Sequence, residues 1–382
     1  MEGLTGYWNE DGRAGTRRMV VVLSLSSFCT EATERICDSV EGVVPLTHAF
    51  GRNEIGLNKT RLESSLLKTA LNPNVRSVLV VGYEPKSTEE YVAALRRRSR
   101  KRVEHVVVSE GGTLEAIRQG SRKALDLAVS ASEARREPIG LGDLTFGLKC
   151  GGSDTTSGIA SNPAVGEATD YIVEHGGTAI FSETTEIIGA EHILAKRAAD
   201  ASVAKRIYSV AKANEELAMS FGVDLVGTNP VPDNIKGGIT TIEEKSLGAI
   251  LKSGTSKIRG VLDYEEEPPG KGLYFMDSPS AAQAVLTALC AAGCQVILFS
   301  TGTGNPVGTA VAPVVKITAN PRTASRMAEH VDVDVSLVLE GRMGMEEAGR
   351  KILHETVAVI NGRMTKAEAL KHREFAPLPA GL

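Results

Sequence analysis

Two runs of aliphatic residues decide the fold of the first part of the chain: Met19–Leu25 reads MVVVLSL and Val75–Gly82 reads VRSVLVVG. Neither run alternates polar with apolar residues, which is typical of strands buried on both faces. Similar runs occupy Val43–Thr47 and Val103–Val108. The segments between these runs repeat apolar residues at helical spacing, so the sequence predicts parallel strands that alternate with helices.

The same alternation returns after an interruption at Ser130–Gly142, where charged residues, a proline and two glycines break the pattern. The later predicted strands are Leu144–Cys150, Thr178–Ser182, Gln295–Ser300 and Val314–Thr318. We therefore expect an α/β fold of two doubly wound, mostly parallel, Rossmann-like domains with a helical C-terminal segment. The predicted units are an N-terminal α/β domain at 1–135 and a C-terminal α/β catalytic domain at 136–382.

The composition argues against several classes of function. With 382 residues, a net charge of −4 and only 4% aromatic residues, the chain gives no reason to expect nucleic acid as a partner. No apolar run is long enough to span a bilayer, which takes about 20 residues. The five cysteines are odd in number and scattered along the chain, which indicates reduced thiols. A cytoplasmic enzyme that contacts no membrane is the expectation.

A first cluster of chemically useful residues, CGGSDTTSG at Cys150–Gly158, follows a predicted strand and precedes a predicted helix. Such a loop exposes backbone N–H groups that suit a carboxylate or sulfonate. Ser153 and Asp154 are candidate substrate contacts, and Cys150 is a candidate metal ligand. The alternative is a tight turn with an Asp or Ser cap.

A second cluster, SETTE at Ser182–Glu186, again follows a predicted strand, and Glu191 and His192 come shortly after it. Glu183, Glu186 and His192 offer metal ligands or a base. The alternative is that a threonine caps a helix whose dipole Glu186 complements, while Glu191 and His192 are solvated.

A third cluster, STGTGNPVG at Ser300–Gly308, does not have the spacing of a dinucleotide fingerprint, and Pro306 would interrupt a helix there. We interpret it as an anion-holding loop and reject a nicotinamide cofactor. Its candidate substrate contacts are Thr301 and Asn305. Lys316 and Asn320, on and after the next strand, could reach the same substrate or could be surface residues.

A fourth cluster, LTHAFGRN at Leu46–Asn53, ends a strand of the first domain. His48 could be a metal ligand or a general base, and Arg52 could grip an oxyanion with two hydrogen bonds. A single histidine is more often structural, so local sequence alone does not select His48.

The chain resembles the altronate/galactarate dehydratase family. The resemblance is carried by GLKCGGSDTTSGIASNPAVGEA, GGTAIFSETTEIIGAEH, TGTGN, KITANP and the opening GYWNEDGRAGTRR. The family's small N-terminal domain does not precede this opening, which implies a separate small partner subunit. Sugar-acid dehydratases of the family have His-x-Gly-Cys-Gly where this chain has His48-Ala49-Phe50-Gly51-Arg52, and the arginine form resembles the sulfo-lyase branch.

This resemblance implies a lyase that performs a metal-assisted α,β-elimination on a 2-hydroxy acid, giving a 2-keto acid. Sulfite release from (2R)-sulfolactate, giving pyruvate, is the expected reaction. Arg52 would then hold the sulfonate in its planar fork. The alternatives are water elimination from an altronate- or galactarate-type sugar acid, and a non-catalytic paralogue that binds sugar acids.

The resemblance and the clusters together give the expected site. The expected catalytic residues are His48, Glu183 and Lys316. The expected substrate-binding residues are Arg52, Ser153, Asp154, Thr301, Asn305 and Asn320. The expected metal ligands are Cys150, His48, Glu183, Glu186 and His192. The expected cofactor is a divalent metal, Fe²⁺ in this family, and we expect a homo-oligomer with a small partner subunit and a small-molecule 2-hydroxy acid as substrate.

Overall fold

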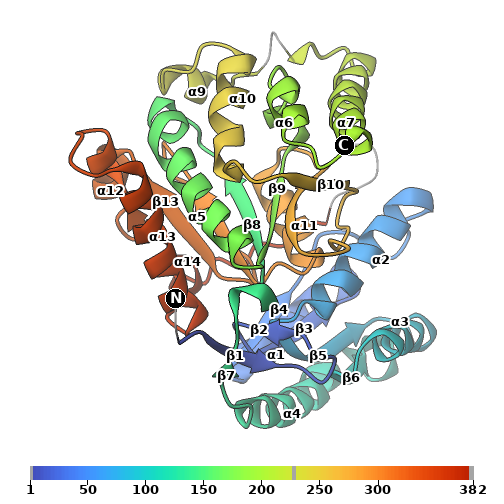
Figure 1. Ribbon diagram of the computed structural model, residues 1–382. Coiled ribbons are helices and arrows are strands. Elements are labelled where there is room, and N and C mark those ends of the chain that lie inside the picture. Colours follow the sequence, from blue (N-terminus) through green and yellow to red (C-terminus); the bar gives the residue numbers. More distant parts are fainter. Residues whose placement is uncertain (1–2, 226–228, 378–382) are drawn as a thin grey trace.

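The computed structural model describes residues 3–225 and 229–377 and has a mixed α/β architecture (Figure 1). The first sheet is parallel and has the strand order β4-β3-β5-β6. Its strands are β3 (Met19–Ser24), β4 (Val43–Leu46), β5 (Val75–Gly82) and β6 (Arg102–Val107). The two aliphatic-rich strands β3 and β5 lie at its centre, where both faces are buried.

Helices cover both faces of this first sheet. They are α1 (Thr30–Ser39), α2 (Gly56–Leu71), α3 (Pro85–Arg98) and α4 (Gly112–Ser132). The apolar stripes of α1 and α4 pack on one face, and those of α2 and α3 pack on the other. The four predicted strands and the helices predicted between them are confirmed to within three residues at each end. The sequence pattern predicts those helices at Thr30–Glu41, Lys59–Leu71, Thr88–Lys101 and Gly112–Glu133.

The second sheet is also parallel and has the order β10-β11-β9-β8-β12-β13-β14. Its strands are β8 (Thr145–Cys150), β9 (Thr178–Ser182), β10 (Ile258–Leu262), β11 (Gly272–Met276), β12 (Val296–Ser300), β13 (Val314–Thr318) and β14 (Val333–Asp334). Helices α5 (Asn162–Glu174), α7 (Ala201–Ser220) and α13 (Met345–Ile360) cover one face. Helix α11 (Ala282–Ala291) covers the other.

A continuous apolar core joins the two sheets. Helix α2 of the first layer packs against α11 of the second, and one hydrophobic cluster includes strand residues of both sheets. Removing this apolar surface from water stabilises the contact between the two units. The relative position of the sheets is therefore set by a buried interface.

The opening of the chain forms a small antiparallel sheet that was not predicted. Strand β1 (Thr5–Trp8) pairs with β2 (Ala14–Gly15) and with β7 (Glu137–Pro138). The nearby Arg17 forms an ion pair with Glu368 at 2.7 Å. Strands of two to four residues carry no detectable periodicity, so only these long-range contacts reveal them.

Elsewhere the structure corrects three predictions. The apolar pattern of Ala190–Ala201 predicts a helix over that whole stretch, but the structure has the shorter α6 (Glu191–Lys196). The loop predicted at Asn229–Gly238 contains the one-turn helix α9 (Pro232–Lys236), because a proline suits a first helical turn. Strands β10 and β11 were missed.

The remaining helices are α10 (Ile242–Ile250), α12 (Pro321–Arg326) and α14 (Lys366–Ala369). The helical C-terminal segment, which the sequence predicts at Met345–Glu374, is the pair α13 and α14 followed by extended chain. Among the described residues, no helix combines the length and apolarity that crossing a membrane requires.

Candidate functional site

The loops after β8 and β12 meet where the strand order of the second sheet reverses. Strands β8 and β12 are neighbours, but the chain continues from β8 to one side of the sheet and from β12 to the other. Ligands of open α/β sheets bind beyond the carboxyl ends of the strands at such a point. The backbone N–H of Thr303 donates to the Gly152 carbonyl at 2.8 Å, which ties the two loops together.

Asp154 is the polar centre of these joined loops. Its Oδ1 accepts from the Ser157 backbone N–H at 2.8 Å, and its Oδ2 accepts from Asn320 Nδ2 at 2.8 Å. A Cβ atom at Gly302 would overlap its carboxyl group. Asp154 and Asn320, both predicted as substrate contacts, are therefore brought together and held tightly.

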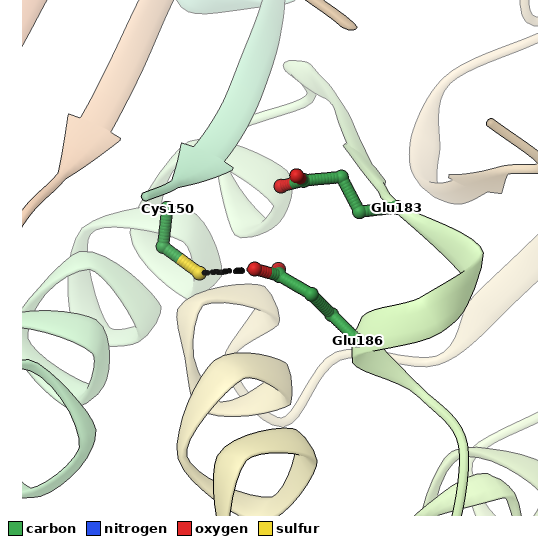
Figure 2. A group of neighbouring side chains, drawn as sticks. All are labelled: Cys150, Glu183 and Glu186. Atoms are coloured by element: carbon green, nitrogen blue, oxygen red, sulfur yellow. Dashed lines mark hydrogen bonds between the residues drawn. The ribbon is translucent and has the colours of Figure 1, made fainter. Parts of the chain in front are cut away.

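Next to these loops lies a buried group of five ionisable side chains, three of which Figure 2 shows pointing toward one another. They are Lys149, Cys150, Glu183, Glu186 and Lys252. Each is at most 3% exposed. Burial of this many charges is expensive unless each is paired, so the pairing decides the chemistry.

Two ion pairs satisfy most of the charges in this cluster. Lys149 Nζ lies 2.8 Å from Glu183 Oε1, and Lys252 Nζ lies 2.8 Å from Glu186 Oε2. The Cys150 thiol donates to Glu186 Oε2 at 3.1 Å, and Lys252 Nζ lies 3.4 Å from its sulfur. Strand β8 supplies Lys149 and Cys150, and the turn Leu251–Ser253 supplies Lys252. Glu183 directly follows β9, and Glu186 ends the turn Thr184–Glu186.

Protonation within the cluster follows from burial and pairing. Burial raises the pKa of the Cys150 thiol to about 12. Burial also raises the pKa of Glu183, with the neighbouring Glu186 carboxylate adding to the effect. For Glu186 the burial effect is outweighed by Lys252 and Lys149, and its pKa is lowered. One carboxyl is thus firmly charged and the other is poised to take up a proton.

Glu183 is unusual in its backbone and in its side chain. Its φ of 79° is a left-handed conformation that a residue with a Cβ rarely adopts. Its Oε2 is buried and has no hydrogen-bond partner, whereas Oε1 is bound by Lys149. Strained backbone and an unsatisfied buried oxygen both cost free energy, so they point to a group used in function.

These residues can hold a metal ion. One ligand atom each from Cys150, Glu183 and Glu186 lies within 4.8 Å of the other two. The unpartnered Glu183 Oε2 provides a free lone pair toward a cation, and a thiolate with two carboxylates is a mixed donor set that first-row transition metals accept. The donor set therefore fits a divalent metal.

Lys316 lies in register with this cluster across two strands. Lys149, Phe299 and Lys316 are direct neighbours on β8, β12 and β13, so they share one face of the sheet. Both ammonium groups lie near the Phe299 ring, with nitrogens 5.2 Å (Lys149) and 5.0 Å (Lys316) from its centre. Burial lowers the pKa of Lys316 to about 8. Lys316 Nζ donates to the Val307 carbonyl at 2.5 Å.

Three other predicted site residues lie in the joined loops. Ser153 is buried, and its carbonyl accepts from Asn234. Thr301 Oγ1 accepts from the Gly304 backbone N–H at 3.0 Å, and Asn305 Oδ1 accepts from that of Val307 at 3.0 Å. Thr301 and Asn305 shape their own loop in this structure.

The structure does not bring His48, His192 or Arg52 to the Cys150 group. His192 is exposed on α6. His48 is buried in the first unit, where its Nε2 lies 3.2 Å from the Ser24 carbonyl, and burial lowers its pKa to about 4. Arg52 forms an ion pair with Glu84 and lines a cavity formed by residues of the first unit.

Sequence reasoning missed Lys149 and Lys252, the two cations of the cluster. A lysine inside an otherwise apolar strand was a signal for Lys149, because an unpaired charge is rarely buried. No local feature distinguishes Lys252, which comes from a turn after α10 and reaches the cluster only through the tertiary fold.

Comparisons with known proteins identify the family of the chain. Residues 141–382 match the family described as D-galactarate/altronate dehydratase, C-terminal, and residues 6–132 match the second domain of D-galactarate dehydratase/altronate hydrolase. The chain is 42% identical to the (2R)-sulfolactate sulfo-lyase subunit beta of Chromohalobacter salexigens, over 97% of this chain and 95% of that protein.

Altronate dehydratases are similar at a lower level. That of Bacillus subtilis is 31% identical over 99% of this chain and 78% of its own length. That of Escherichia coli is 31% identical over 90% of this chain and 69% of its own length. These matches extend over both units and include the loops that hold the buried cluster. The chain belongs to the D-galactarate/altronate dehydratase family of lyases.

Proposed function

We propose that this chain is the catalytic subunit of a lyase that releases sulfite from (2R)-sulfolactate and yields pyruvate. The observation that carries the proposal is the 42% identity, along nearly the whole chain, to a protein named as a subunit of that enzyme. The relatives named altronate dehydratases are more distant, at 31% identity. The buried Lys149, Cys150, Glu183, Glu186 and Lys252 supply a site of the kind that such an elimination needs.

The proposed cofactor is Fe²⁺, which Cys150, Glu183 and Glu186 would hold. When bound, the metal would act as a Lewis acid that stabilises negative charge on the substrate, an effect worth several kcal/mol. With both lysines and both glutamates charged, the cluster as paired here is close to neutral. Loss of the Cys150 proton would add the negative charge that favours a cation.

The substrate anion is proposed to lie against the joined loops after β8 and β12. Gly151–Asp154 and Thr301–Asn305 present backbone and side-chain polar groups at the reversal point of the sheet. Asn320 fixes the orientation of Asp154. The proposal gives this role to the loops and not to Arg52, because Arg52 lines a different cavity.

Lys316 is proposed as the proton acceptor. Its neutral amine would take the C2 proton, the C2 electron pair would form the C2–C3 double bond, and the C3–S pair would leave with sulfite. The enol would then tautomerise to pyruvate. Adjacent strands are about 5 Å apart, so the backbones of Lys316 and Lys149 lie about 10 Å apart across the sheet. One small substrate can bridge this span. A pKa of about 8 makes the neutral amine accessible near neutral pH.

The leaving group favours sulfite release over water loss in this site. Hydroxide needs a general acid or a metal at C3, and the proposed Fe²⁺ is assigned to the charge that develops on the substrate carboxylate, whereas sulfite departs as a stable anion. A buried thiol with a pKa raised to about 12 and two ammonium groups already paired are poor proton donors to a leaving hydroxyl.

We further propose a two-domain, doubly wound, Rossmann-like organisation divided near residue 135, with a small partner subunit and more than one copy of the chain in the assembly. The relative being named a subunit beta supports the partner. The five free cysteines of this chain suit a reducing compartment, and we propose a cytoplasmic location.

An anaerobic assay with added Fe²⁺ tests the reaction. The chain, produced with its small partner subunit, is supplied separately with (2R)-sulfolactate, altronate and galactarate. We expect sulfite and pyruvate in equal amounts from sulfolactate. Water loss from a sugar acid with no sulfite from sulfolactate would refute the proposal. Iron analysis of Cys150→Ala against the control Cys37→Ala, at a half-buried cysteine of the first unit, tests the ligand assignment: we expect iron to be lost only in the first.

A further inference from the structure

The first sheet has a cavity of its own, beyond the carboxyl ends of β3 and β5. The cavity has a volume of about 480 Å³, within the range of small-molecule sites. Leu25 and Ser26, which follow β3, line it together with Tyr83 and Glu84, which follow β5. Because the strand order is β4-β3-β5-β6, this is where the order of the first sheet reverses. Both sheets therefore place polar groups at their reversal point.

An ion pair lies on the wall of this cavity. Arg52 and Glu84 are bonded to each other, and both remain partly exposed, at 35% and 56% of their side chains. The Arg52 guanidinium lies over the Tyr83 ring at 4.5 Å and over the Phe28 ring at 5.2 Å. Stacking on two rings holds the planar fork in place while leaving its N–H groups available to a ligand.

The rest of the lining combines acidic groups with an apolar wall. Glu54, Glu63 and Glu90 join Glu84 as carboxylates, and the lining cations are Arg52 and Lys59. This excess of carboxylates disfavours a ligand that is only an anion. Leu62 and Leu66 supply apolar surface. The hydroxyl of Tyr91, which also lines the cavity, is buried and has no hydrogen-bond partner.

We propose that this cavity is a second ligand site, separate from the Cys150 cluster, for a small zwitterion such as an amino acid or an amino sulfonate. The anionic end replaces Glu84 on the Arg52 guanidinium, and the ammonium end takes the released Glu84 carboxylate. Every charge of the original ion pair then keeps a partner of opposite sign. An aliphatic side chain packs on the leucines. This ligand is chemically distinct from the 2-hydroxy acid of the proposed reaction, which has no ammonium group.

Calorimetric titration of the unchanged full chain tests the charge requirement. The probes are leucine and taurine, with 4-methylpentanoate, which lacks the ammonium group, and 3-methylbutylamine, which lacks the carboxylate. We expect at least one zwitterion to bind, and each single-charge analogue to bind on the order of tenfold more weakly or worse. Binding of leucine but not taurine identifies a carboxylate ligand, and the reverse identifies a sulfonate. No binding of either zwitterion at millimolar concentration overturns the proposal, as does equal binding of 4-methylpentanoate.

Variants of the zwitterion's contacts locate the binding. Arg52→Met and Glu84→Gln should each weaken the bound zwitterion on the order of tenfold or more. The matched control is Arg35→Met, which breaks another exposed Arg–Glu pair, with Glu31, outside the cavity. Arg52→Lys keeps the positive charge but not the planar guanidinium. Its affinity for the zwitterion should lie between that of the unchanged chain and that of Arg52→Met. If Arg35→Met weakens binding as much as Arg52→Met does, or if Glu183→Gln abolishes binding, the site is not the proposed one.

Discussion

The reversal points of the two parallel sheets carry similar residue types in different surroundings. Next to the β8–β12 reversal point of the second sheet, Lys149 near the end of β8 pairs with Glu183, which follows β9, and both side chains are 2% exposed. Beyond β3 and β5, the Arg52–Glu84 pair is 35% and 56% exposed. Water screens the second pair and makes it easy to exchange for a ligand, whereas the first pair is costly to separate. The same topological position thus gives a rigid, desolvated reaction centre in one unit and an adaptable cavity in the other.

The largest expected effect concerns two lysines whose pKa values are lowered, one in each unit. Lys316→Met should lower kcat on the order of 10² to 10⁴ fold, because it removes the proposed proton acceptor. In the unchanged protein, kcat should rise as the pH rises through about 8, since only the neutral amine accepts a proton. Steady-state sulfite release across pH measures both.

The control is Lys101→Met, since burial also lowers the pKa of Lys101, to about 7, but in the first unit. It should keep the activity and the pH profile of the unchanged chain. If both variants lose activity alike, the proposed role of Lys316 as the proton acceptor is wrong, because the loss is then not specific to the second unit.

The next effect compares a buried ion pair with an exposed one. Lys252→Met leaves Glu186 without its ammonium partner inside the fold, and should reduce the free energy of unfolding by about 3–5 kcal/mol. Lys212→Met breaks the exposed pair with Glu216 on α7 and should cost under about 0.5 kcal/mol. Urea unfolding at neutral pH measures both, and similar losses would mean that the cluster is hydrated.

A pH effect is expected from His48 in the first unit. Burial lowers its pKa from 6.5 to about 4, so the unfolded chain takes up a proton before the folded chain does as the pH falls. Stability should therefore drop between pH 6.5 and 4, by up to about 3 kcal/mol. His48→Gln should remove this part of the pH dependence in urea unfolding. His354→Gln, at an 83% exposed side chain, should retain it.

The smallest effect compares a glycine at each reversal point. Gly302→Ala places a Cβ against the Asp154 carboxyl and should cost about 1–3 kcal/mol and weaken substrate binding. Gly51→Ala, next to Arg52, meets no atom within 4 Å and should change stability by less than about 0.5 kcal/mol. Thermal unfolding and the KM for sulfolactate give the comparison. Equal tolerance would show that the loops around Asp154 relax.

Much of the fold was predictable because local patterns carry it. The strands β3, β5 and β9 are mostly apolar and do not alternate polar with apolar residues, and such strands need partners on both sides. Strand β10 (IRGVL) was missed because it contains an arginine and a glycine. Strand β11 was missed because it begins at Gly272, where the proline- and glycine-rich loop Asp263–Gly272 ends. The same patterns predicted that Cys150 ends a strand and that Asp154 and Glu183 lie in the loops that follow strands.

The site was predictable only where its residues follow strands. Cys150 and Glu183 end neighbouring strands, so their meeting follows from parallel pairing. Asn320 meets Asp154 for a similar reason, since it follows β13. His48 and Arg52 also follow a strand, but β4 belongs to the first sheet. No sequence pattern indicates how the edges of the two sheets are placed relative to each other, so the sequence could not show that these two residues lie away from Cys150.

By itself, the sequence determined the alternation of strands and helices and the residue types available at each strand end, because both depend on neighbours a few positions apart. Only the tertiary structure decided which of these groups share one desolvated space. Lys252 joins Glu186 from 66 positions away, and Arg52 faces Glu84 in a separate cavity. Burial and pairing depend on atoms that are distant along the chain, so no local pattern could have fixed them.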